Sequence, residues 1–163
     1  MKYGPCMSLA ILCTSFGIAG ADDFKPPPMK DGLWETRSKQ TQQGKTVFDM
    51  SSKMCQSQEL TKSMESMGGE ARKKNACTST VTQPSPNMYV EESRCAKGPN
   101  AGSVTKITYT HLGDTSSHTE MRVSDGKSET VTIVDTRYLS ACPAGMKPGD
   151  AVTADGKTIS GGR

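Results

Sequence analysis

The chain has 163 residues, a formal net charge of +3, six cysteines, ten methionines and a single tryptophan. Its length suits one domain, and an apolar fraction of 33% with 5% aromatic residues predicts a thin hydrophobic core that depends on crosslinks. So small a positive charge does not indicate nucleic acid or an acidic membrane surface as a partner.

The first 21 residues have the pattern of a secretory signal peptide. Lys2 gives a positive start, residues 6–18 are mostly apolar, and Ala19-Gly20-Ala21 offers small residues before a cleavage site after Ala21. A membrane-spanning helix needs about 20 apolar residues, whereas this run is shorter and is interrupted by hydroxyl side chains. We therefore expect residues 1–21 to be removed on export and the mature chain to have no transmembrane segment.

The mature chain divides by composition into three parts. Residues 22–31, which include three consecutive prolines, predict an extended lead-in that cannot join a central strand. Residues 32–142 form a single β-rich domain. Residues 143–163 are rich in Gly and Pro and predict a largely flexible tail.

Four cysteines remain after export, and in an oxidising compartment they form disulfides by default, with three possible connectivities. The stretch CTSTVTQPSPNMYVEESRC folds as a hairpin about the turn QPSPN, which places Cys77 opposite Cys95. This pairing leaves Cys55 to join Cys142. A four-cysteine zinc site is the alternative, but no C-x-x-C spacing is present.

The stretch GLWETRSKQTQQGKTVFDMSSKMC alternates about a Gln-Gly turn and predicts a second hairpin. With a three-residue loop ending at Gly44, Trp34 lies opposite Ser52. Trp34, Phe48 and Met50 then share one buried face.

The next segment changes to helical periodicity. In SQELTKSMESMGG, Leu60, Met64 and Met67 recur at helical spacing, Ser57 is a suitable N-cap, and Gly68 predicts the helix end. We expect the apolar stripe to pack on the sheet. Thioether ligation of copper(I) by Met64 and Met67 is the functional alternative, and filling of an irregular core explains the methionines equally well.

Three further strands are predicted over residues 103–112, 116–124 and 128–139, all rich in alternating Thr and Val. His111 and His118 flank the first turn and are candidates for a metal site or an acid–base pair. Matching the apolar faces pairs Tyr109 with Met121, and in that register the two histidines point to opposite sides of the sheet. We therefore expect both to be surface residues.

No catalytic motif appears in the sequence: there is no G-x-S-x-G elbow, phosphate-binding glycine loop or H-E-x-x-H pattern. With all four mature cysteines in disulfides, no thiol nucleophile remains. The sequence therefore predicts neither an enzyme nor a bound cofactor.

Several features taken together resemble a known family. These are KDGLWETRSKQT near the start, a first cysteine in DMSSKMCQS followed by a short helix, two central cysteines, and the ending TRYLSACPAGMKPGD. Over nearly all of residues 29–150 the chain resembles domain-of-unknown-function family 3617, which occurs in exported proteins of bacterial envelopes. The resemblance implies a periplasmic location and a small β-rich fold, and it carries no catalytic residues.

We therefore predict a mainly β fold: a curved, barrel-like antiparallel meander of about seven strands with one short helix, stapled by disulfides. The favoured function is a non-catalytic periplasmic binding or interaction module. It would hold a small apolar ligand against Trp34, Phe48, Met50 and Tyr109, or pair an edge strand with an envelope protein. The alternative is copper handling through the methionines or histidines, and an enzyme is the third possibility.

Overall fold

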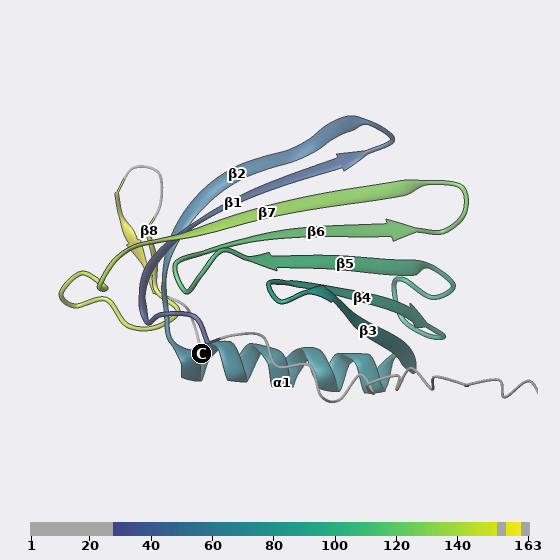
Figure 1. The fold of residues 1–163 in the computed structure, drawn as a ribbon. Coiled ribbons are helices and arrows are strands. Elements are labelled where there is room, and N and C mark those ends of the chain that lie inside the picture. Colours follow the sequence, from purple (N-terminus) through teal and green to yellow (C-terminus); the bar gives the residue numbers. More distant parts are fainter. Residues whose placement is uncertain (1–27, 153–155, 161–163) are drawn as a thin grey trace, which may run out of the picture.

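The computed structural model describes residues 28–152 and 156–160, so the predicted signal peptide and most of the lead-in lie outside the described residues. Within them the chain forms one helix and nine strands (Figure 1). In chain order these are β1 (Gly32–Gln42), β2 (Lys45–Gln56), α1 (Gln58–Lys74), β3 (Cys77–Ser85), β4 (Met88–Cys95), β5 (Val104–His111), β6 (Ser116–Ser124), β7 (Glu129–Ser140), β8 (Ala151–Val152) and β9 (Thr158–Ile159).

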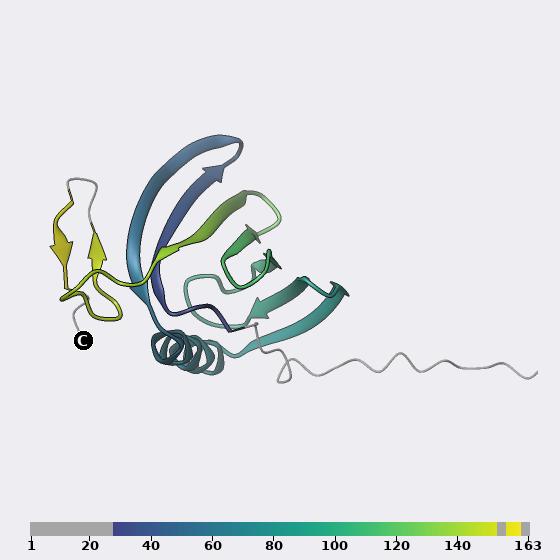
Figure 2. The same ribbon diagram turned by 60° about the vertical axis from the view of Figure 1, so that its left-hand side comes forward.

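All nine strands belong to one antiparallel sheet in the order β3-β4-β5-β6-β7-β1-β2-β8-β9. The sheet is strongly curved, but β3 and β9 lie at its opposite edges, so it does not close into a barrel (Figure 2). The predicted fold class is confirmed. The sheet exceeds the expected seven strands because two short strands, β8 and β9, come from the tail that composition predicts to be largely flexible.

The β1–β2 hairpin keeps the predicted shared face but not the predicted register. Trp34 lies opposite Met54 rather than Ser52. The loop is shorter than expected: Gln43 and Gly44 form a two-residue turn with φ angles of 50° and 78°, as the tight hairpin turn requires. An extra residue, Val47, then bulges out of the pairing. The total shift is two residues, so Phe48 and Met50 remain on the face of Trp34.

The β5–β6 hairpin also differs from the predicted register by two residues. Tyr109 pairs with Thr119, and Ile107 takes Met121 as its partner. The connection is tighter than expected because the N–H of Leu112 already donates to the carbonyl of Ser116. An even shift leaves His111 and His118 on opposite faces.

Helix α1 begins as predicted, with the N–H of Leu60 donating to Oγ of Ser57 at 3.1 Å. Its predicted end at Gly68 is wrong, because the helix runs through both glycines to Lys74 and a left-handed residue appears only at Ala76, with φ of 50°. Three basic residues in the last turn complement the negative end of the helix dipole.

The expected packing of the α1 stripe on the sheet is also wrong. No residue of α1 is buried, and Met64 and Met67 are 51% and 59% exposed. The helix connects β2 to the distant edge strand β3 and lies beside β3 at the open side of the curve (Figures 1 and 2). It therefore crosses the opening of the sheet without filling it.

Both predicted disulfides are present. Cys77–Cys95 joins directly opposed residues of β3 and β4. Cys55–Cys142 joins the end of β2 to the segment after β7. Beside it, the N–H of Cys55 donates to the carbonyl of Asp150, and the N–H of Gly149 donates to the carbonyl of Cys55. The start of the tail is thereby fixed against β2.

The core is as thin as the composition predicts. Among the described residues, the buried apolar side chains are Trp34, 1% exposed, and Cys55, 0% exposed. The indole N–H of Trp34 donates to the carbonyl of Lys30 at 2.8 Å, and its ring meets Tyr138 edge-on at 5.7 Å. The lead-in and the three strands around Trp34 therefore form the packed end of the molecule.

The two disulfides should contribute unequally to stability. They close loops of 87 and 18 residues, for which the chain-entropy estimate gives about 4 to 5 and about 3 kcal/mol. We expect C55A/C142A to lower the free energy of unfolding more than C77A/C95A, as measured by urea denaturation without reductant. Equal losses, or the reverse order, would contradict this ranking.

Gly32 should tolerate no side chain. Its φ is 149°, and an added Cβ would meet the carbonyl oxygen of Ser140 at 2.4 Å. We expect G32A to lower the free energy of unfolding by about 2 kcal/mol or more. As a control, G68A, which adds a methyl group to α1 where no atom lies within 4 Å, should raise it by up to about 1 kcal/mol. Thermal denaturation of both variants tests the contrast.

Candidate functional site

The two faces of the sheet differ sharply in chemistry. Strand register places Trp34, Phe48, Met50 and Tyr109, the predicted ligand-facing residues, on one face, which we call the inner face. It lies on the side of α1, whereas the other face is the outer face. The apolar side chains of the inner face are Trp34, Phe48, Met50, Met54, Val81, Tyr89, Ile107, Tyr109, Met121, Val123, Val134 and Tyr138.

The inner face is almost free of charge. Along β1 to β7 its polar positions are chiefly Thr, Ser and Gln. Its acidic or basic residues are Glu91 within the sheet, Lys45 at the β1–β2 turn and His111 at the end of β5. Desolvation raises the pKa of Tyr109, although a hydrogen bond to Ser117 opposes this. The inner face is therefore suited to contact with an uncharged, largely apolar molecular surface.

In the part of the chain that the structure describes, no second layer covers much of this apolar surface. The predicted burial of Phe48 and Met50 is wrong, because they are 44% and 46% exposed. The other apolar residues of the inner face, apart from Trp34, are only half-buried. Met29 in the lead-in reaches Trp34 and Tyr109, where a cavity of only about 10 Å³ remains. The inner face is thus packed at the Trp34 end and open toward the β1–β2 turn.

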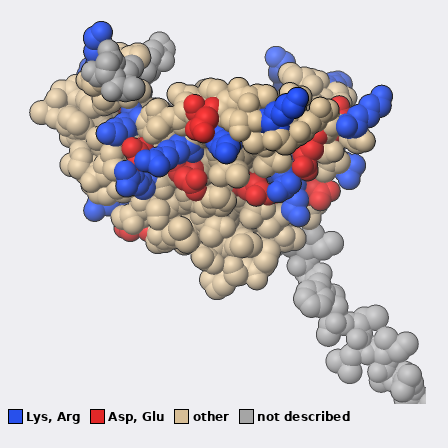
Figure 3. All heavy atoms as spheres, turned by 90° about the horizontal axis from the view of Figure 1, so that it is seen from above, with Lys and Arg blue, Asp and Glu red and all other residues tan. Residues whose placement is uncertain are grey.

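The outer face carries the ion pairs. Figure 3, which views the sheet from the side away from α1, shows basic and acidic side chains interspersed across it. The pairs are Glu35–Arg37, Glu35–Arg137, Glu92–Arg94, Asp135–His118, Glu120–Arg122 and Glu129–Arg122. Three of these pairs join residues two apart on one strand, and the other three join neighbouring strands. Sequence inspection missed the pairs between strands because finding those partners requires the register. Alternation of charged and apolar residues along β6 and β7 is the signal that could have indicated them.

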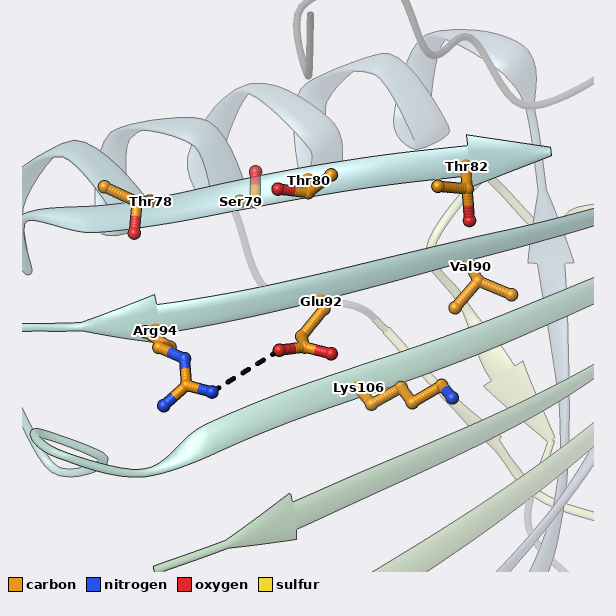
Figure 4. Close-up of a pocket in the computed structure, with 8 residues that line it drawn as sticks. All are labelled: Thr78, Ser79, Thr80, Thr82, Val90, Glu92, Arg94 and Lys106. Atoms are coloured by element: carbon orange, nitrogen blue, oxygen red, sulfur yellow. Dashed lines mark ion pairs between the residues drawn. The ribbon is translucent and has the colours of Figure 1, made fainter. Parts of the chain in front are cut away.

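A shallow hollow of about 470 Å³ lies on the outer face over β3, β4 and β5 (Figure 4). Its lining is rich in hydroxyl groups: Thr78, Ser79, Thr80, Thr82, Val90, Glu92, Arg94 and Lys106. Glu92 and Arg94 lie 3.6 Å apart and are both exposed, so this pair contributes little. The lining holds no nucleophile paired with a base. The hollow can therefore make polar contacts with a ligand, but it has no arrangement of groups for catalysis.

The two histidines predicted as metal candidates do not come together. His118 Nδ1 lies 2.7 Å from the carboxylate of Asp135 on the outer face, while His111 stacks on Tyr89 on the inner face. Met64 and Met67 lie on exposed turns of α1. In residues 28–152 and 156–160, no group of three or more His, Cys, Asp or Glu side chains is arranged to hold a metal ion.

One edge of the sheet is only partly covered. Among residues 28–152 and 156–160, the pairing of β8 with β2 comprises Lys53 and Met54. Within the described chain, the half of β2 from Lys45 to Ser52 is therefore an edge, and it carries the exposed apolar side chains of Val47, Phe48 and Met50. The sequence did not indicate this edge, because the order of strands in a sheet is a tertiary property.

The sequence model of a protein family matches residues 29–142, and its description is "Protein of unknown function (DUF3617)". The chain belongs to this family. The match to DUF3617 covers β1 to β7, α1 and both disulfides, and it ends before β8. No curated protein and no solved structure matches the chain. Among the described residues of this DUF3617 protein, no helix is long and apolar enough to cross a membrane.

Glu35 is the buried acid of the outer face. Its carboxylate accepts a hydrogen bond from Nε of Arg137 at 2.6 Å, and this bond holds the pKa of Glu35 below its usual value. Because the pKa is lower in the folded chain than in the unfolded chain, the stabilisation is complete above about pH 5 and is lost as the pH falls through the folded pKa.

We expect E35Q to weaken this pH dependence. Its urea midpoint should fall less between pH 6 and pH 3 than that of the wild type, because glutamine has no proton to gain. E92Q, which changes the exposed acid of the Glu92–Arg94 pair, is the matched control and should follow the wild type. An E35Q curve parallel to the wild type would show that the Glu35–Arg137 contact does not contribute.

Proposed function

We propose that this DUF3617 protein is an exported, periplasmic, non-catalytic binding protein that holds an apolar ligand on the inner face of its sheet. The observation that carries the proposal is an extensive apolar face that neither a second sheet nor α1 covers. Apolar surface left in water costs about 25 cal/mol per Å², and large exposed apolar patches mark binding surfaces. A ligand lying between the sheet and α1 would cover this face.

Export is supported by the signal-like first 21 residues and by the two disulfides, which persist in oxidising compartments. A Gram-negative envelope, and so the periplasm, agrees with the family resemblance. These features support the location independently of the ligand.

A non-catalytic role is supported by the arrangement of the reactive groups. All four cysteines of the described chain are in disulfides. His118 is paired with Asp135 on the outer face, whereas Ser117, its neighbour in sequence, turns to the inner face and meets Thr136 at 2.7 Å. Ser117 is therefore not presented to this histidine for activation, and the hydroxyl of Ser116 donates to the carbonyl of Leu112 at 3.2 Å.

A substitution on the inner face tests the proposal. We expect the purified protein to bind the uncharged probe N-phenyl-1-naphthylamine saturably, with a rise in probe fluorescence. M50E places a carboxylate on the apolar surface and should weaken binding at least tenfold. S51E is the adjacent substitution on the outer face and should change the affinity less than twofold. Non-saturable binding, or equal loss in both variants, would reject the proposal.

The open half of β2 favours a second candidate, strand pairing with an envelope protein. Cys55 and Lys53 turn their backbone groups toward the tail and β8, so by alternation the N–H of Ser51 points to the open edge. S51P removes that N–H while leaving the pairing with β1 intact. Loss of a partner with S51P and unchanged probe binding would favour this candidate.

A further inference from the structure

The strand order places four chain connections at one end of the inner face. Neighbouring strands from β3 to β2 are antiparallel, so the β1–β2, β4–β5 and β6–β7 turns and the α1–β3 junction all lie at the same end (Figure 1). Two of them are in direct contact, because the N–H of Lys97 donates to the carbonyl of Asn75 at 3.0 Å and Ala96 donates to Ala76. This is the open end of the inner face, away from Trp34.

These connections are strongly basic. Their basic residues, which we call the basic rim, are Lys45, Arg72, Lys73, Lys74, Lys97 and Lys127. All are exposed, and none takes part in an ion pair found within the described chain. The acids at this end are Asp125 and Glu129, the first residue of β7. The carboxylate of Asp125 already accepts the N–H groups of Lys127 and Ser128 at 2.8 Å, and that of Glu129 pairs with Arg122 on the outer face at 3.2 Å.

At the opposite end of the sheet, acidic residues outnumber basic residues. Its connections hold the acids Asp31, Glu59, Asp114 and Asp150 against the bases Lys30 and Lys147. Asp31 caps the first N–H of α1 and Asp150 accepts the N–H of Lys147, so two of these acids have structural roles. The basic rim is therefore a local feature and not a consequence of the net charge of +3.

The length of the inner face fits one acyl chain. From Trp34 to Gln42, whose partner Lys45 lies on the same face, β1 extends roughly 26 Å at about 3.3 Å per residue. A bilayer core of about 30 Å holds two acyl chains end to end, so one chain needs about half of that length. A tail could thus lie on the open part of the inner face with its polar end at the basic rim.

We infer that the ligand is an amphiphile with one acyl chain and an anionic head, a carboxylate or a phosphate, whose tail lies on the inner face and whose head lies at the basic rim. This inference rests on the proposed function and adds the class of ligand and its direction. An almost uncharged inner face accepts the tail, and the unpaired cations attract the head.

The test compares ligands that share a tail and differ in the head. Myristate, myristoyl lysophosphatidylglycerol and the zwitterionic myristoyl lysophosphatidylcholine are titrated, each below its critical micelle concentration, by displacement of N-phenyl-1-naphthylamine. The rim variant is K45E/K127E. The matched control K39E/K106E reverses two unpaired lysines of the outer face and changes the net charge equally.

We expect the wild type to bind at least one anionic ligand tenfold or more tightly than lysophosphatidylcholine. K45E/K127E should weaken binding of that ligand at least tenfold and binding of lysophosphatidylcholine less than twofold. K39E/K106E should change neither by more than twofold. Preference for lysophosphatidylglycerol over myristate would identify a phosphate head, and the reverse a carboxylate head.

Two outcomes would overturn the inference, and they are distinguishable. If the three ligands bind equally and the rim variant has no effect, or if both double variants lose affinity alike, the anionic head is rejected and the proposed apolar site remains. If none of the three displaces the probe, or the probe itself does not bind, the proposed function fails together with the inference.

Discussion

Cys55 is the point on which the geometry of the sheet depends. It is fully buried, it is bonded to Cys142, and both of its backbone groups are hydrogen-bonded to the tail. The two longest strand pairings, β1 with β2 and β1 with β7, therefore end in a crosslinked junction. Beyond it the sheet relies on ladder hydrogen bonds and on the Cys77–Cys95 disulfide, because a single layer has little apolar volume to bury.

The small amount of buried apolar surface connects folding stability with ligand binding. A domain of this size ordinarily packs its sheet against a second layer, and here the sheet has one helix beside an edge strand. The packed end around Trp34 supplies rigidity, while the other end of the same apolar face is left accessible. The open inner face and the thin core thus have the same cause, the lack of a second layer. A ligand bound to that face would also stabilise the folded state.

Local signals predicted much of this fold from the sequence. The symmetric spacing about QPSPN determined the Cys77–Cys95 pairing, and the hydroxyl of Ser57 marked the start of α1. The two-residue errors at the β1–β2 and β5–β6 turns arose because apolar alternation specifies a face and not a register. The end of α1 was missed because glycine only weakens a helix interior, and the helix instead continues to its basic last turn.

The candidate site could likewise be predicted only where local sequence signals determine it. Alternation was sufficient to place Trp34, Phe48, Met50 and Tyr109 on one face, since each register error was an even number of residues. It could not show that Phe48 and Met50 would remain exposed, because this depends on where α1 lies. The basic rim could not be seen either, since its six residues come from four connections that only the strand order brings to one end.

The bulge at Val47 has a consequence for how this chain can change in evolution. Val47 is unpaired and lies between the two-residue turn and Phe48, so that Phe48 lies on the same face as Trp34. A change in the length of the turn can therefore be offset by the loss or gain of a bulge residue. Between Phe48 and Cys55 the pairing with β1 is uninterrupted. A single insertion or deletion there would turn Phe48 and Met50 to the charged face or misplace the Cys55 thiol. Relatives should therefore vary in length at the β1–β2 tip and keep the spacing from Phe48 to Cys55.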